Sequence, residues 1–135
     1  MNKCVLDASA VLAYLNDEPG AAEIERWLDS ASCLLSAANY AEVLSKLADY
    51  GMPLAEASKA VAILDLKIEA VDADIARRIA ALRAPTRDAG LSLADRACLA
   101  LAGRETCAAI TADRPWLTLA EALQIDVRCI RPDAH

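Results

Sequence analysis

Four of the twenty acidic residues in this 135-residue chain lie where a carboxylate could do chemistry. Two follow strand-like segments and two lie in the first turns predicted for helices; they are Asp7, Asp113, Glu42 and Asp95. If all four converge on one edge of a sheet, a divalent cation relieves their mutual repulsion. Hard oxygen ligands select Mg²⁺ or Mn²⁺, which keep several waters for a substrate and a nucleophile.

Each of these acids also has a simpler interpretation as a helix cap. Asp is among the best N-cap residues, which suits both Asp7 and Asp113. Asn39-Tyr-Ala-Glu42 and Ser92-Leu-Ala-Asp95 fit the capping box, in which the later carboxylate reaches back to the cap's backbone N–H. Thr118-Leu-Ala-Glu121 fits it too, and there we expect a cap alone. A cap and a metal ligand can be the same side chain, so both interpretations stay open.

Asp95 is the hardest of the four to explain as a cap. Its predicted helix is apolar on nearly every side except at Asp95 and Arg96, which indicates a buried helix. A buried carboxylate is costly unless it is paired or bound to a metal. Pairing with Arg96 is disfavoured because adjacent helical residues do not face each other. We therefore expect Asp95 to be buried and to bind a metal.

Other catalytic chemistry has little to work with. The one histidine, His135, is the last residue, which argues against histidine zinc sites, Ser-His-Asp triads and a histidine general base. The five cysteines are scattered and never spaced as CxxC, so we expect reduced core residues in a cytoplasmic protein. Any catalysis must therefore rest on carboxylates, a metal, or both.

Composition predicts one globular domain over residues 1–135, because 56% of the residues are hydrophobic and the length suits a single core. No apolar run approaches the roughly 20 residues of a membrane span, and Asp7 interrupts the apolar stretch that a secretion signal would need. The net charge of −6 argues against a nucleic-acid partner. Seven of the ten arginines fall within 77–114, where they form either a solvated surface or phosphate contacts.

The elements that must position these acids alternate along the chain, which is typical of a parallel α/β sheet with helices on both faces. The predicted strands are 3–6, 32–36, 67–71, 107–111 and 126–130. The predicted helices are 8–15, 21–30, 40–50, 54–65, 73–84, 93–103 and 118–124. In such sheets ligands gather outside the carboxyl ends of the strands, which is where Asp7 and Asp113 are expected.

Four ordered blocks carry a family resemblance that covers essentially the whole chain. They are Val5-Leu-Asp7-Ala-Ser9-Ala, Asn39-Tyr-Ala-Glu42-Val, Leu91-Ser-Leu-Ala-Asp95-Arg-Ala-Cys-Leu-Ala and Ile110-Thr-Ala-Asp113-Arg-Pro-Trp116. With these blocks the chain resembles PIN-domain proteins, and among them the VapC-type toxin ribonucleases. The resemblance implies a Rossmann-like sheet on which Asp7, Glu42, Asp95 and Asp113 bind Mg²⁺ or Mn²⁺ and catalyse cleavage of RNA.

The resemblance also implies a homodimer that a cognate antitoxin protein silences. Ser9 matches a small hydroxyl position beside the first acid, where it would orient a ligand or phosphate. Some relatives carry a further acid where this chain has Trp116, which leaves the number of metal ions open. Metal-assisted hydrolysis would leave 5′-phosphate and 3′-hydroxyl ends, and a route through the 2′-hydroxyl would lack its usual histidine base.

Three alternatives remain from the sequence. An aspartyl-phosphate domain of the dehalogenase or receiver type would require a second Asp in place of Ser9, or a lysine late in the chain, and the last lysine is Lys67. A non-catalytic PIN-like interaction domain would be expected to lack one of the four acids. A DNA or flap nuclease would need helical insertions that 135 residues do not hold.

Overall fold

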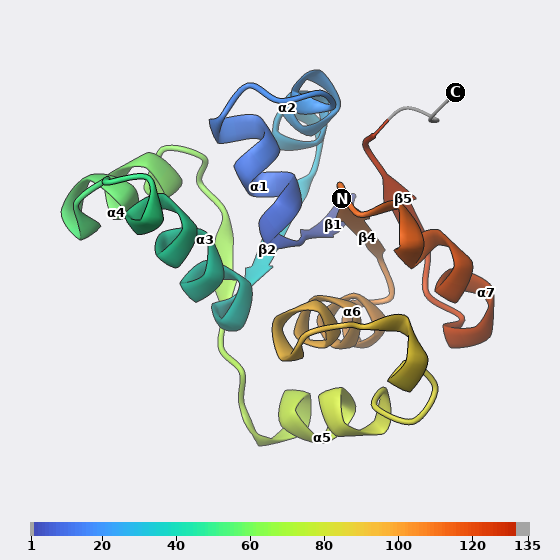
Figure 1. Ribbon diagram of the computed structural model, residues 1–135. Helices are drawn as coiled ribbons and strands as arrows, with labels where there is room; N and C mark the ends of the chain where they lie inside the picture. Colours follow the sequence, from blue (N-terminus) through green and yellow to red (C-terminus); the bar gives the residue numbers. More distant parts are fainter. Residues whose placement is uncertain (1, 132–135) are drawn as a thin grey trace.

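The protein is described by a computed structural model over residues 2–131, so His135 lies outside the described residues. Five parallel strands form one sheet in the order β3-β2-β1-β4-β5 (Figure 1). The strands are β1 Lys3–Leu6, β2 Ser32–Ser36, β3 Lys67–Glu69, β4 Ala108–Thr111 and β5 Val127–Cys129. The predicted α/β class is therefore confirmed.

The helices cover both faces of the sheet, as predicted (Figure 1). They are α1 Ala8–Leu15, α2 Ala21–Ser30, α3 Ala37–Asp49, α4 Leu54–Ala62, α5 Ala73–Ala81, α6 Leu93–Glu105 and α7 Ala120–Leu123, with 3₁₀ turns η1 Arg87–Ala89 and η2 Arg114–Leu119. None of the described helices is both long and apolar enough to cross a membrane.

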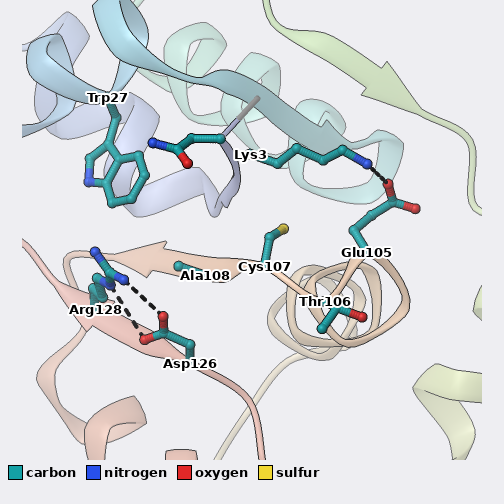
Figure 2. A pocket seen from close by; sticks show the side chains of 9 residues that line it. Lys3, Trp27, Glu105, Thr106, Cys107, Ala108, Asp126 and Arg128 are labelled. Atoms are coloured by element: carbon teal, nitrogen blue, oxygen red, sulfur yellow. Dashed lines mark hydrogen bonds and ion pairs between the residues drawn. The ribbon is translucent and has the colours of Figure 1, made fainter.

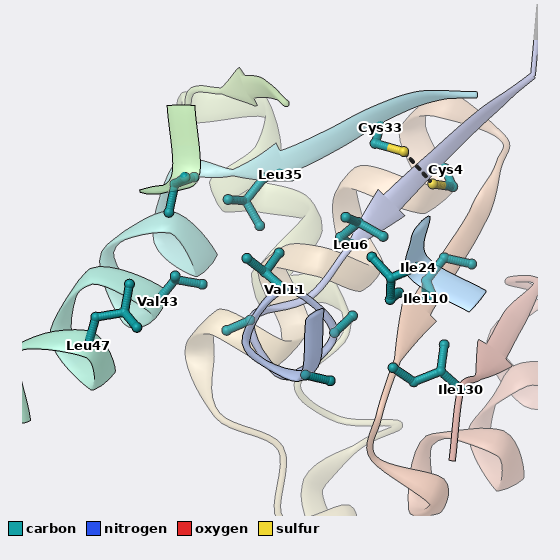
Figure 3. Close-up of a cluster of buried hydrophobic side chains, with 14 of the residues drawn as sticks. Cys4, Leu6, Val11, Ile24, Cys33, Leu35, Val43, Leu47, Ile110 and Ile130 are labelled. Atoms are coloured by element: carbon teal, nitrogen blue, oxygen red, sulfur yellow. Dashed lines mark hydrogen bonds between the residues drawn. The ribbon is translucent and has the colours of Figure 1, made fainter. Parts of the chain in front are cut away.

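Alternation along β1 divides the core into two halves. Cys4 and Leu6 face one hydrophobic cluster, which α1 to α4 complete, while Val5 faces the other, which α5 and α6 complete. Figure 3 shows the first cluster, where the Sγ atoms of Cys4 and Cys33 lie 3.4 Å apart on neighbouring strands. All five cysteines are free thiols; three are buried in the core, as the sequence predicted for all of them, and two are only half-buried.

Several predicted boundaries were wrong for local reasons. Helix α3 begins at Ala37 rather than near 40, because Ser36 caps it by accepting a hydrogen bond from the Asn39 N–H. Gly103 does not end α6, which continues to Glu105 and stops at Thr106 in the left-handed conformation.

The prediction of a cap at Thr118 was also wrong. Residue 118 lies inside η2, where its hydroxyl donates to the carbonyl of Pro115, and α7 starts only at Ala120. Because the chain is already helical before residue 118, the side chain has no free helix start to cap, and Glu121 forms no capping box there.

The strand order places a topological switch point between β1 and β4. From β1 the chain moves to β2 and β3 on one side, and then returns to β4 and β5 on the other. The connections leave the carboxyl ends of β1 and β4 in opposite directions, which opens a crevice above these two strands. Asp7 follows β1 and Asp113 comes two residues after β4, so both lie at this crevice.

Candidate active site

A cavity of about 460 Å³ lies at the carboxyl edge of the sheet. Its walls include all four acids singled out by the sequence, namely Asp7, Glu42, Asp95 and Asp113. They come from four separate elements, because Asp7 begins α1, Glu42 lies in α3, Asp95 lies in α6 and Asp113 precedes η2. The tertiary structure therefore brings together side chains that lie up to 106 positions apart in the sequence, from 7 to 113.

Asp7 is the buried member of the group, with 2% of its surface exposed. Its Oδ1 accepts a 2.8 Å hydrogen bond from the Ala10 N–H, so the residue caps α1 as expected. The Ser9 hydroxyl donates to the same carboxylate at 2.8 Å, and the Thr111 hydroxyl donates to Oδ2 at 2.7 Å. A carboxylate offers about four acceptor sites, so these three donors leave one free for a ligand.

Thr111 is a residue that sequence reasoning missed as part of the site. It is fully buried at the end of β4, and its hydroxyl accepts the Asp113 N–H at 2.9 Å while donating to Asp7. Ser9 makes a parallel link, because its Oγ accepts the Ala112 N–H at 2.9 Å. A polar residue closing an otherwise apolar strand, two positions before an acid, was the signal available in the sequence.

Burial raises the pKa of Asp7 to about 7. Loss of hydration is the largest cause, the charge of Asp95 adds to it, and the three hydrogen bonds oppose it. Burial and the charge of Asp95 also raise the pKa of Glu42, while Lys46 lowers it. Asp95 therefore interacts electrostatically with both Asp7 and Glu42, as expected for acids that line one cavity.

Glu42 does not belong to a capping box, which corrects the sequence prediction. With Ser36 as the cap, Glu42 lies in the second turn of α3. Asn39 is the buried residue that fixes this helix: its Nδ2 donates to the Ala94 carbonyl at 3.1 Å, and its Oδ1 accepts from Ser36 Oγ at 2.6 Å. Residues three apart share a helix face, so Asn39 ties the face carrying Glu42 to the start of α6.

Asp95 forms the predicted capping box with Ser92. The Ser92 N–H donates to Asp95 Oδ2 at 3.0 Å, and the Asp95 N–H donates to Ser92 Oγ at 3.0 Å. The expected burial of Asp95 was wrong, because only the later part of α6 is buried and its first turn stays partly open. Arg96 does not pair with Asp95, as expected, and donates to the Ile79 carbonyl instead.

Asp113 holds the N-cap position of η2, but its side chain makes no capping hydrogen bond. Its carboxylate is exposed at the cavity wall. Trp116, three residues later, is fully buried in the core formed with α5 and α6. Position 116 therefore serves packing in this chain and does not contribute to the cavity.

The positively charged side chain among the described residues of the cavity wall is Arg131, which the sequence reasoning did not single out. Its guanidinium pairs with Glu18 at 3.0 Å and donates to the Pro19 carbonyl at 3.2 Å. The arginines within 77–114 do not line this cavity. Among them, Arg78 pairs with Asp74 and Arg104 pairs with Glu69 and Glu105, which are surface ion pairs.

The oxygen atoms at the cavity are of the kind that coordinate a hard divalent cation. They are carboxylate and hydroxyl oxygens, and Asp7 retains an acceptor site while Asp113 is not engaged as a cap. Within residues 2–131, no group of three or more His, Cys, Asp or Glu side chains is arranged so that it could hold a metal ion by itself. Mg²⁺ keeps several waters and can be bound through one or two carboxylates, so it does not require such a group.

A second cavity, of about 440 Å³, lies at the opposite, amino ends of the strands (Figure 2). Its charges are already paired, because Lys3 bonds to Glu105 at 3.1 Å and Arg128 bonds to Asp126 at 3.0 Å. Arg128 also lies over the Trp27 ring, 5.3 Å from its centroid. Because these charges are paired with each other, the cavity lined by the four acids, called the acid cavity below, is the stronger candidate for chemistry on a bound substrate.

Comparison with solved structures shows where this fold occurs. A toxin-antitoxin complex from Klebsiella pneumoniae matches with a TM-score of 0.72 at 20% identity, over 96% of this chain and 99% of that one. VapBC2 from Rickettsia felis, bound to a DNA fragment from its promoter, matches with a TM-score of 0.67 at 14% identity, over 94% and 98%. VapBC-5 from Mycobacterium tuberculosis matches with a TM-score of 0.61 at 24% identity, over 98% and 100%.

Sequence comparison identifies the family directly. No curated protein matches the chain significantly. The model of the PIN domain family, however, matches residues 4–122, which contain all four acids. The resemblance recognised in the four sequence blocks is therefore confirmed: this chain belongs to the PIN domain family.

Proposed function

We propose that this protein is a metal-dependent endoribonuclease that acts as the toxin of a toxin–antitoxin pair. The observation that carries the proposal is the convergence of Asp7, Glu42, Asp95 and Asp113 on one cavity at the switch point of the sheet. Four carboxylates at such a place are costly unless a cation accompanies them. A nuclease uses that cation on the phosphodiester of its substrate.

Asp7, Asp95 and Asp113 would hold Mg²⁺ or Mn²⁺, directly or through water. When bound, the ion supplies polarisation of the phosphodiester and a lowered pKa for a coordinated water. Asp7 is pre-oriented for this role by Ser9 and Thr111, which leave one acceptor site open. The raised pKa of Glu42 suits its carboxylate to position the attacking water and to take its proton.

The proposed reaction adds the water oxygen to phosphorus and breaks the P–O3′ bond. The 3′ oxygen leaves and gains a proton, which gives a 3′-hydroxyl on one fragment and a 5′-phosphate on the other. We propose RNA as the substrate because the four sequence blocks resemble those of VapC-type ribonucleases, and because the 135 residues do not hold the helical insertions expected of flap nucleases.

Cleavage of single-stranded RNA with Mg²⁺ or Mn²⁺ tests the enzymatic part. We expect cleavage that EDTA abolishes, product ends as above, and a loss of at least about 100-fold in Asp7→Asn and Asp95→Asn. Asp74→Asn is the matched control, because Asp74 is an exposed acid on α5 that pairs with Arg78 away from the cavity. The proposal fails if cleavage survives EDTA or if both site variants cleave like Asp74→Asn.

The toxin role is supported by the similar structures, which are described as toxin–antitoxin complexes. We propose a cytoplasmic homodimer that a cognate antitoxin protein silences. Induced expression of the wild-type chain in a bacterial host should arrest growth and degrade RNA, whereas Asp95→Asn at the same protein level should not. Co-expression of a short protein from the neighbouring reading frame should restore growth, and arrest by Asp95→Asn as well would contradict the toxin role.

A further inference from the structure

Arg131 lines the acid cavity without forming any of the hydrogen bonds that hold the four acids. Among the described residues that form the cavity wall, it is the one that carries a positive charge. Its side chain is 30% exposed, so it faces both the cavity and solvent. An anionic substrate that enters this cavity therefore meets one fixed cation beside the carboxylates.

Strand register explains why Arg131 reaches the cavity. Strands β4 and β5 are parallel, with Thr111 opposite Cys129, and the Ile130 N–H donates to the Thr111 carbonyl at 2.9 Å. Asp113 and Arg131 are each two residues past that pair. They therefore leave neighbouring strands at the same level of the carboxyl edge.

The turn between α1 and α2 holds the guanidinium in place. Glu18 accepts from Nη2 at 3.0 Å, and the Pro19 carbonyl accepts from Nη1 at 3.2 Å. Gly20 lets this turn approach: its φ is +100°, and a Cβ there would lie 2.8 Å from the Ile130 carbonyl oxygen. Only a glycine allows this contact, so the close approach of Gly20 to Ile130 fixes the position of the backbone that leads into Arg131.

Among the described residues, these partners accept from two of the five guanidinium N–H groups, so the other three can donate to a ligand. The planar fork of Arg matches the oxygens of a phosphate, and the site already lies where a phosphodiester would be hydrolysed. We propose that Arg131 binds a backbone phosphate of the RNA next to the bond that is cut. This inference rests on the proposed nuclease function and adds a substrate-binding residue to it.

Steady-state cleavage of an oligoribonucleotide tests the inference. Arg131→Ala should raise KM by about 5- to 10-fold with a small change in kcat, and Arg131→Lys should recover part of the loss. Arg128→Ala is the matched control, because Arg128 is an exposed arginine of β5 whose side chain lines the opposite cavity. It should leave KM unchanged.

Binding without turnover provides a second measurement. Fluorescence anisotropy of a labelled single-stranded RNA with the Asp7→Asn protein should show weaker binding when Arg131→Ala is added. The slope of log K against log salt should become shallower by about 0.7, the value for one phosphate contact on a single strand. Unchanged KM and unchanged slope would overturn the inference.

Glu18→Gln separates substrate binding from a structural role. If Arg131 only anchors the end of β5, Glu18→Gln and Arg131→Ala should lower stability equally and leave KM unchanged. If Arg131 binds phosphate, Arg131→Ala should raise KM while Glu18→Gln leaves it nearly unchanged, because a glutamine oxygen can still accept from Nη2 and the guanidinium stays beside the cavity. Absence of cleavage by the wild type would refute the nuclease proposal itself, whereas cleavage with an unaltered Arg131→Ala would refute this inference alone.

Discussion

The Thr111 hydroxyl donates a 2.7 Å hydrogen bond to Oδ2 of Asp7 and joins the ends of β4 and β1 across the switch point. The same oxygen accepts the N–H of Asp113, so one buried threonine orients the first acid and the backbone of the fourth. A change at Thr111 should therefore affect both stability and the site.

Thr111→Val keeps the shape of the side chain but removes the hydroxyl. It leaves a buried acceptor on Asp7 and a donor on Asp113 without partners, so we expect a loss of about 1–3 kcal/mol in the free energy of unfolding. Affinity for Mn²⁺ should fall as well. Urea denaturation and calorimetric titration measure the two effects. Thr118→Val, at an exposed threonine of η2, should change stability by less than about 0.5 kcal/mol, and equal losses in both variants would argue against the role of Thr111.

The raised pKa of Asp7 predicts that the metal-free protein loses stability as pH rises. Between the ordinary value of 3.8 and about 7, the folded protein keeps a proton that the unfolded chain has released. Stability from this group is therefore complete below about pH 4 and falls through pH 7, by an amount on the order of 4 kcal/mol. Urea denaturation in EDTA at pH 5 and pH 8 measures the part of the fall between pH 5 and pH 7, which is about 3 kcal/mol.

Asp7→Asn provides the control for that pH dependence. It cannot ionise, and it should therefore lose less stability than wild type between pH 5 and pH 8. Added Mg²⁺ should stabilise the wild type more at pH 8 than at pH 5, because binding requires the deprotonated carboxylate, and it should stabilise Asp7→Asn less. Parallel pH profiles for the two proteins would show that Asp7 is not the group responsible.

Asp95 and Ser92 allow capping to be separated from catalysis. Asp95→Asn keeps an oxygen that can accept the Ser92 N–H, so it should fold within about 1 kcal/mol of wild type and yet lose activity. Ser92→Ala removes the cap, so it should lower the free energy of unfolding by about 1 kcal/mol while most of the cleavage activity remains. If Ser92→Ala is as inactive as Asp95→Asn, then the Asp95 carboxylate supports activity mainly by capping α6.

Asn39→Leu should loosen the contact between α3 and α6. It removes the hydrogen bond to the Ala94 carbonyl and that to Ser36, so we expect the free energy of unfolding to fall by about 1–3 kcal/mol. We also expect a lower kcat, because the helices that carry Glu42 and Asp95 are no longer joined by this side chain. Ser45→Ala is the control, since its exposed hydroxyl only bonds to the carbonyl of Ala41 in the same helix. A kcat equal to that of the control would contradict the positioning role.

The sequence by itself predicted the fold class and singled out the four acids that line one cavity in the structure. Alternating strand-like and helical segments indicate a parallel sheet, and a carboxylate that directly follows an apolar strand, as Asp7 does, must lie at the carboxyl edge. These are local signals, which a single pass along the chain can find. The capping of α1 by Asp7 and of α6 by Ser92 and Asp95 is equally local and was predicted correctly.

Only the tertiary structure decided how the site is supported. The contacts of Thr111 with Asp7, of Asn39 with Ala94, and of Arg131 with Glu18 join positions that are 104, 55 and 113 residues apart. No spacing rule links residues at such separations, because strand order and register set their proximity. Burial is decided in the same way: Asp7 is desolvated by the β1–β4 crevice, whereas the apolar helix that suggested a buried Asp95 leaves its first turn open.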